Sequence, residues 1–77
     1  MLKKVKAGKG KLAGARVAVV ASTYNRRYVD GMLDAAAAEL ARAGAAATVV
    51  RVPGAFEIPV VAAELARGGA VDAVVCL

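Results

Sequence analysis

Short valine-rich runs alternate with segments of helical character, and this alternation constrains the fold more than any other feature of the sequence. Runs bounded by turn residues are typical of strands, and here they occupy residues 17–21, 48–52 and 72–77. A first helix is predicted from about Arg27 to Gly44, and a second from near Pro59 to Gly68 and Gly69. The alternation predicts an α/β protein with a βαβαβ order, in which a parallel sheet lies between helices as a three-layer sandwich.

The first predicted helix has one apolar face and one polar face. Apolar residues recur at i, i+3, i+4 and i+7, and we expect the buried face to hold Val29, Met32, Leu33, Ala36, Ala37 and Leu40. The opposite face carries Asp30, Asp34 and Arg42. Alanines 35–38 serve as helix filler, and alanines 45–47 are predicted to form a short connection.

Composition limits both the core and the chemistry. The chain has 77 residues, enough for one domain at most, and 20 of them are alanine, so each apolar residue brings little area to bury. No histidine is present, which removes the commonest general base and zinc ligand, and Cys76 is the lone cysteine. We therefore expect no metal site, and a chain without the usual means of catalysis.

Positive charge is concentrated at the start of the chain. Residues 1–16 hold six basic and no acidic residues, so the other 61 residues sum to a charge of −1. We expect residues 1–15 to form a solvated, partly disordered basic tail that does not serve nucleic-acid binding, because it has no interleaved aromatic residues. With neither a signal peptide nor a membrane span in evidence, we expect a soluble cytoplasmic protein with a reduced thiol.

The third predicted strand reaches Leu77 with no turn residue, cap or helix after it. A three-stranded parallel sheet with two open edges leaves backbone groups and apolar faces without partners. We therefore expect residues 16–77 to be the first half of a single domain.

Two connections are predicted to meet at the edge where parallel strands end, which is where such sheets bind ligands. Tyr24 and Asn25 follow the first strand, and can stack on a flat heterocycle and hydrogen-bond its edge. The alternative is that Tyr24 packs on the end of the sheet and Asn25 caps the helix.

After the second strand come Gly54, Ala55, Phe56 and Glu57, whose backbone N–H groups and carboxylate can bind the hydroxyls of a polyol. The alternative is an ordinary Pro-Gly turn, with Glu57 favouring the dipole of the second helix.

The motifs VAVVASTYN, VVRVPGAFEIPVVAAELARGG and VDAVVCL resemble the amino-terminal half of lumazine synthase across nearly all of residues 16–77. The resemblance implies the first half of a flavodoxin-like fold. It also implies a transferase of riboflavin biosynthesis, which condenses 5-amino-6-(D-ribitylamino)uracil with 3,4-dihydroxy-2-butanone 4-phosphate to give 6,7-dimethyl-8-ribityllumazine. The family uses no cofactor, and it forms homopentamers and, in some members, icosahedral capsids of 60 subunits.

By this resemblance, Tyr24 stacks on the pyrimidinedione beside Asn25, although the family more often has phenylalanine or tryptophan at this position. Residues 54–57 hold the ribityl chain and the pyrimidine. The family's phosphate-binding motif and histidine fall beyond Leu77, so no catalytic residue is expected in this chain, and the 77 residues alone are expected to be inactive. The alternative is a non-catalytic assembly or scaffold piece of the same family.

Overall fold

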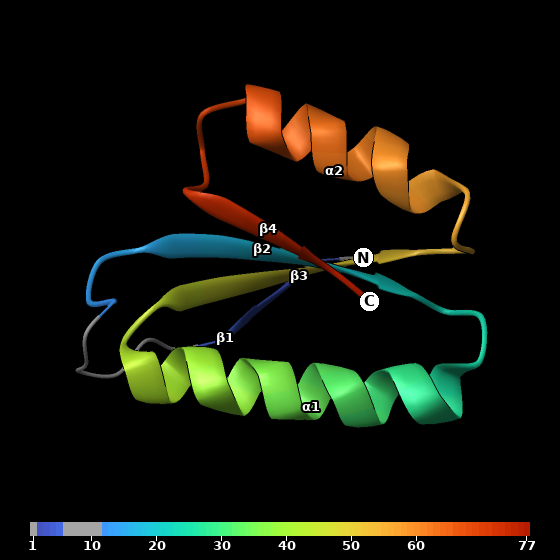
Figure 1. Cartoon of the computed structure of the whole chain (residues 1–77), viewed down its shortest axis with the longest axis horizontal. Helices are drawn as coiled ribbons and strands as arrows, with labels where there is room; N and C mark the ends of the chain where they lie inside the picture. Colours follow the sequence, from blue (N-terminus) through green and yellow to red (C-terminus); the bar gives the residue numbers. More distant parts are fainter. Residues whose placement is uncertain (1, 6–11) are drawn as a thin grey trace.

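The computed structural model describes residues 2–5 and 12–77, with side chains from Leu12 onward. Within these residues the elements are β1 (Leu2–Val5), β2 (Arg16–Ser22), α1 (Arg26–Ala43), β3 (Ala46–Val52), α2 (Glu57–Arg67) and β4 (Ala73–Cys76). Figure 1 shows the sheet lying between the two helices, with α1 on one face and α2 on the other. From β2 onward the order is βαβαβ, so the predicted α/β class and layering are confirmed.

The strands lie in the order β1-β3-β2-β4. β2 is central to the parallel part of the sheet, where it pairs with β3 from Arg16 to Ser22 and with β4 from Val17 to Val20. Ser22, the last residue of β2, lies opposite Val52, the last residue of β3. Both strands therefore end at the same edge of the sheet, and their following loops begin side by side.

β1 was not predicted from the sequence. Leu2–Val5 pairs in antiparallel fashion with β3, where Leu2 lies opposite Val50 and Val5 opposite Ala47. This corrects the expectation of a solvated tail for these four residues. The outer edge of β3 has N–H and C=O groups that need partners, and a nearby segment can supply them despite its lysines. Residues 6–11, which hold the rest of the predicted tail up to Lys11, lie outside the described residues.

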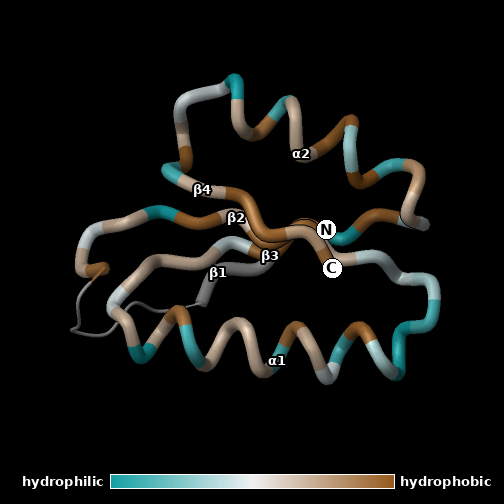
Figure 2. Tube along the Cα trace, viewed as in Figure 1, coloured by the Kyte–Doolittle hydropathy of each residue, from teal (hydrophilic) through white to brown (hydrophobic). Residues whose placement is uncertain are grey.

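The core is built around β2. Its side chains from Val17 to Ser22 are all buried, and those of Val19 and Val20 have no exposed surface. Successive residues of a strand point to opposite faces, and each face of β2 is covered by a helix, so both faces must be apolar. Figure 2 shows hydrophobic residues along the strands and hydrophilic residues mainly in the helices and loops. Burial of each of these two valines contributes about 1.5 to 3 kcal/mol.

α1 ends at Gly44, as predicted, because the backbone there turns left-handed with φ of 88°. Glycine adopts this conformation without strain, and the N–H groups of Gly44 and Ala45 donate to carbonyls of the last turn. The predicted buried face is wrong at Met32, which is 49% exposed. α1 packs mainly on β2 and β3, and of its predicted buried face Val29 is buried while Leu33, Ala36, Ala37 and Leu40 are half-buried.

β3 begins earlier than predicted, because alanines 46 and 47 join the strand and Ala47 is buried against β2. α2 begins at Glu57, which places Pro59 in the first helical turn, where its missing N–H needs no partner. α2 packs on β2 and β4, yet none of its residues is fully buried.

β4 is held at its beginning by an ion pair. The Arg16 guanidinium contacts the Asp72 carboxylate at 3.2 Å, and the Arg16 backbone N–H donates to the same carboxylate at 2.8 Å. These hydrogen bonds hold the pKa of the Asp72 carboxyl below its ordinary value. The strand itself is only half-buried at Val74 and Val75 and exposed at Ala73 and Cys76, so β4 is covered much less than β2.

Candidate functional site

The first loop of the site joins β2 to α1 through three residues, Thr23–Asn25. The Ser22 hydroxyl oxygen accepts a hydrogen bond from the Tyr24 N–H at 2.9 Å, which bends the chain as it leaves the strand. Asn25 then adopts a left-handed conformation with φ of 53° and ψ of 43°, which asparagine tolerates better than most residues. The turn is therefore set by local polar residues, and it leaves Tyr24 at its apex.

The second loop joins β3 to α2 through residues 53–56. Two successive turns form it, because the Glu57 N–H donates to the Gly54 carbonyl at 3.2 Å and the Ile58 N–H donates to the Ala55 carbonyl at 3.3 Å. Among the hydrogen bonds of the described residues, none is donated by the N–H of Ala55 or Phe56. Both amides are therefore open to a ligand at the start of α2.

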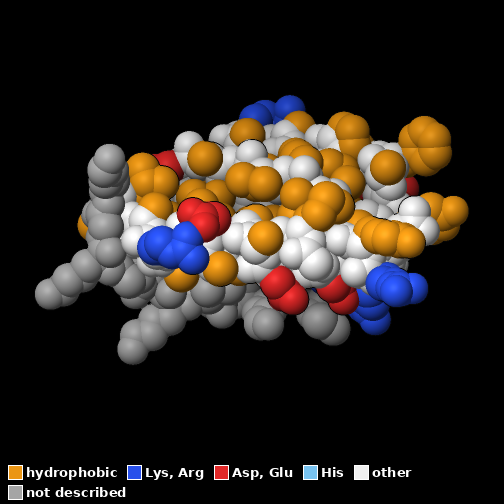
Figure 3. All heavy atoms as spheres, turned by 60° about the horizontal axis from the view of Figure 1, so that its bottom comes forward, with side chains coloured by type: hydrophobic (Ala, Val, Ile, Leu, Met, Phe, Trp, Pro, Cys, Tyr) orange, Lys and Arg blue, Asp and Glu red, His pale blue; other side chains and the backbone are white. Residues whose placement is uncertain are grey.

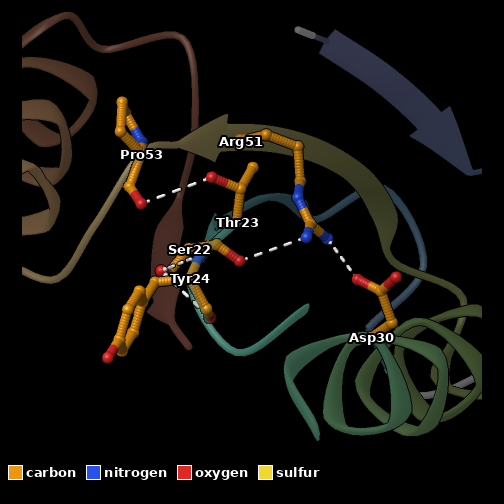
Figure 4. Close-up of polar contacts among 6 residues, drawn as sticks. All are labelled: Ser22, Thr23, Tyr24, Asp30, Arg51 and Pro53. Atoms are coloured by element: carbon orange, nitrogen blue, oxygen red, sulfur yellow. Dashed lines mark hydrogen bonds and ion pairs between the residues drawn. The ribbon is translucent and has the colours of Figure 1, made fainter. Parts of the chain in front are cut away.

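Thr23 connects the two loops by hydrogen bonds. Its N–H donates to the Val52 carbonyl at 2.7 Å, and its hydroxyl donates to the Pro53 carbonyl at 3.3 Å. Figure 4 shows the Thr23 side chain reaching Pro53, with the Tyr24 ring pointing away from Arg51. The structure thus brings together the two segments that the sequence predicted to meet.

The alternative for the first loop, with Tyr24 packed on the sheet and Asn25 capping the helix, fits only in part. Tyr24 is 71% exposed, so its ring does not pack down on the sheet. Asn25 does occupy the N-cap position, where its carbonyl accepts hydrogen bonds from the N–H groups of Tyr28 and Val29, but its side chain makes no capping bond. Within residues 12–77, neither side chain is engaged by a hydrogen bond, so both can contact a ligand.

The alternative for the second loop, an ordinary Pro-Gly turn with Glu57 favouring the helix dipole, is compatible with the structure. Glu57 is the acidic residue in the first turn of α2, where a negative charge favours the helix dipole. Its carboxylate also lies back over the loop, since a Cβ added at Gly54 would come within 3.4 Å of the Glu57 Oε1 atom. Gly54 thus keeps the space between this carboxylate and the loop backbone open.

Large side chains are exposed at this end of the molecule. Phe56 is 93% exposed, and Tyr28 is 70% exposed in the first turn of α1, beside the exposed arginines 26 and 27. In Figure 3, apolar and basic side chains lie at the surface at the right-hand end, where Figure 1 places both loops. A flat, polar and hydroxylated ligand would meet aromatic rings, open amides and one carboxylate here.

Two residues near the site, Arg51 and Asp30, were missed in the prediction. Asp30 was assigned to the polar face of α1, but its carboxylate contacts the Arg51 guanidinium at 2.8 Å beneath the first loop. The signal was present in the sequence, because Arg51 is a charged residue inside an otherwise apolar strand. Such a residue needs a polar partner, and only the packing of α1 on β3 identifies that partner.

Among the described residues, no cluster of three or more side chains suited to holding a metal ion is found. Neither helix within residues 12–77 has the length and apolar character needed to cross a membrane.

These features define an α/β protein whose candidate ligand site is formed by two loops at the carboxyl edge of a parallel sheet. The sequence profile of the 6,7-dimethyl-8-ribityllumazine synthase family matches residues 14–77. The chain therefore belongs to the 6,7-dimethyl-8-ribityllumazine synthase family.

Three curated proteins named 6,7-dimethyl-8-ribityllumazine synthase illustrate the similarity. The protein from Desulfotalea psychrophila is 42% identical over 73 residues, which are 91% of this chain and 47% of the relative. The protein from Methylobacterium radiotolerans is 53% identical over 66 residues, covering 86% of this chain and 40% of the relative. That from Kocuria rhizophila is 56% identical over 63 residues, covering 80% and 39% respectively. The chain thus spans less than half the length of these relatives.

Proposed function

We propose that residues 16–77 are the amino-terminal half of a lumazine synthase domain and supply the pyrimidine-binding part of its site. The proposed reaction condenses 5-amino-6-(D-ribitylamino)uracil with 3,4-dihydroxy-2-butanone 4-phosphate to give 6,7-dimethyl-8-ribityllumazine. Family membership over residues 14–77 supports the assignment. The observation that carries it is the pair of loops fastened by Thr23, with an exposed ring on one loop and a carboxylate beside the other.

Each loop has a separate task in this proposal. The ring of Tyr24 stacks on the pyrimidinedione, and the amide of Asn25 lies beside it to bond the edge of the heterocycle. The open N–H groups of Ala55 and Phe56 and the Glu57 carboxylate bind the ribityl hydroxyls, with Gly54 leaving room for the chain. The two loops together hold one substrate at both its flat end and its polyol end.

The rate enhancement then comes mainly from holding the two substrates in reactive positions. The primary amine of the bound pyrimidine attacks the ketone carbon of the second substrate, and one water leaves as the imine forms. Loss of a proton from the adjacent hydroxyl-bearing carbon then expels inorganic phosphate and gives an enol, which becomes a ketone. The ribityl-bearing nitrogen closes the ring on this new carbonyl, and a second water leaves. Holding two reactants in this way can lower a barrier by about 7 to 11 kcal/mol. The chain has no histidine, so proton transfer and phosphate binding are assigned to the other half of the domain.

The test uses the complete synthase chain that carries these residues, supplied with both substrates, and follows lumazine formation by chromatography. Wild type and an Arg42→Gln variant should be equally active, because Arg42 is exposed and its ion pair is with Glu39 on the same helix. A variant that combines Tyr24→Ala with Glu57→Gln should lose most of its kcat/KM. Failure of the wild type to form lumazine would refute the assignment.

A second candidate function, assembly without catalysis, is favoured by one observation. Phe56 is 93% and Val60 is 66% exposed, and they lie one turn apart at the start of α2. An apolar pair presented to solvent in this way suits a contact between subunits, such as the pentamer that we propose for the complete protein. A Val60→Ser variant that loses its oligomeric state but keeps lumazine formation per subunit would separate assembly from the chemistry.

A further inference from the structure

Arg51 is a charged residue where the packing favours an apolar one. Alternate residues of β3 share a face, so Arg51 lies on the same side as Ala47 and Val49, both of which are buried. The Arg51 side chain is itself only 12% exposed. Its guanidinium therefore lies largely out of water, between the sheet and α1.

The guanidinium contacts the residue before the first loop and the helix after it. One terminal nitrogen donates to the Asp30 carboxylate at 2.8 Å, and the other donates to the backbone carbonyl of Ser22 at 3.1 Å. Ser22 is the last residue of β2, and Asp30 lies in the second turn of α1. As Figure 4 shows, the side chain reaches from β3 across to both points, so it connects the residue before the loop with the helix after it.

Packing alone does not explain an arginine at this position. The Arg51 Nε–H is buried and has no hydrogen-bond partner among the residues that the structure describes. A largely buried charge with one unpaired donor is less favourable than an apolar side chain of similar volume. The planar guanidinium of arginine donates to two acceptors at once and fixes their distance and orientation. Neither lysine nor an apolar residue can do this.

We infer that Arg51 is a positioning residue for the pyrimidine-binding loop. By holding the Ser22 carbonyl and Asp30 together, Arg51 keeps the backbone between them in the conformation that includes the left-handed Asn25 and presents the ring of Tyr24. The ring is thereby aligned with the heterocycle before the ligand arrives. This inference rests on the proposed function, since it assigns the loop to the ribitylaminouracil.

The test compares steady-state kinetics of the complete synthase with variants Arg51→Met, Arg51→Lys and Asp30→Asn, and with Arg42→Met as the matched control. In Arg51→Met the KM for ribitylaminouracil should rise about 10-fold while kcat and the KM for butanone phosphate stay within about 2-fold, because a displaced loop affects one substrate. Arg51→Lys should restore only part of the loss, since an ammonium group keeps one contact but not the fork. The control Arg42→Met should have the kcat and KM values of the wild type.

Equal increases in the two KM values, or an Arg51→Met variant indistinguishable from Arg42→Met, would overturn the inference. If Arg51→Met does not fold, Asp30→Asn decides, because it removes the charge of the partner but keeps a hydrogen-bond acceptor for the guanidinium. A selective rise in the KM for ribitylaminouracil in Asp30→Asn supports the positioning role, and unchanged kinetics refutes it. A wild type that makes no lumazine refutes the proposed function instead, so the two failures are distinguishable.

Discussion

Replacing Tyr24 by alanine in the complete synthase should weaken binding of ribitylaminouracil much more than binding of butanone phosphate. Tyr24 stands at the apex of the first loop and is 71% exposed, so one face of its ring is open to a ligand. The loop itself is held by bonds from Ser22 and Thr23 that do not involve the Tyr24 side chain. The substitution should therefore remove the ring and leave the backbone in place.

The magnitude follows from the area that a stacked ligand covers. A fully covered aromatic side chain buries roughly 150 to 250 Å², so a flat ring on one face covers roughly 60 Å² of it. At about 25 cal/mol per Å² this contributes about 1.5 kcal/mol, and the stacking geometry adds about 0.5 to 1.5 kcal/mol. Because alanine still offers a small contact, we expect a loss of about 2 kcal/mol, within the range of about 1 to 3 kcal/mol for a base stacked on an aromatic ring.

A loss of this size corresponds to an increase of about 30-fold in Kd. Isothermal titration of each substrate, or of an unreactive analogue, into wild type and Tyr24→Ala measures it directly. Tyr24→Phe is the matched control, because it keeps the ring, and its Kd should stay within about 3-fold of wild type. Equal losses for both substrates in Tyr24→Ala, or an equal loss in Tyr24→Phe, would refute the stacking role.

Four further outcomes are expected. Glu57→Gln should weaken ligands that carry the ribityl chain by about 1.5 to 3 kcal/mol, the contribution of a hydrogen bond to a charged acceptor, and leave ribityl-free pyrimidines nearly unchanged in titrations. In the complete synthase, Val20→Ala should lower the free energy of unfolding by about 2 to 3 kcal/mol, whereas the exposed control Arg42→Ala should change it by less than about 0.5 kcal/mol, as measured by urea denaturation. Asp72 has a lowered pKa because it accepts hydrogen bonds from Arg16, so its contribution to stability is present above about pH 4 and is lost as the pH falls through the lowered value. Asp72→Asn should flatten that part of an acid-unfolding curve. The 77 residues expressed alone should neither form lumazine nor persist as a monomer in sedimentation experiments, because β4 is poorly covered and α2 has no fully buried residue.

Each of these expectations has a result that contradicts it. Equal weakening of ribityl-free pyrimidines would show that Glu57 acts on the ring or on the helix. Similar losses of stability for Val20→Ala and Arg42→Ala would place the core elsewhere than β2. An unchanged acid-unfolding curve in Asp72→Asn would show that the pair with Arg16 does not couple to folding. A stable monomer of the chain alone, or lumazine formation by it, would show that this half is self-sufficient.

The positions of the two site loops were predictable from the sequence, but the contacts between them were not. Turn residues after each valine-rich run placed Tyr24 and Glu57 at strand ends, and parallel pairing required those ends to share an edge. Thr23 gave no such signal, because a threonine in a turn can bond many groups. Its partners are the carbonyls of Val52, the last residue of β3, and of Pro53, the first residue of the second loop. They lie about 30 residues away and are brought near only by the register of β2 and β3.

By itself, the sequence determined the order of elements from β2 to β4, because periodicity and turn residues act locally. Burial of β2 on both faces was also implied, because residues 17–21 form a continuous apolar run. Tertiary structure decided what depends on neighbours distant in the chain. The pairing of Leu2–Val5 with β3, the exposure of Met32, and the partners of Arg51 each follow from which surface another element covers. A side chain's own chemistry says that it needs a partner, but only the packing of helices on the sheet brings that partner within hydrogen-bonding distance.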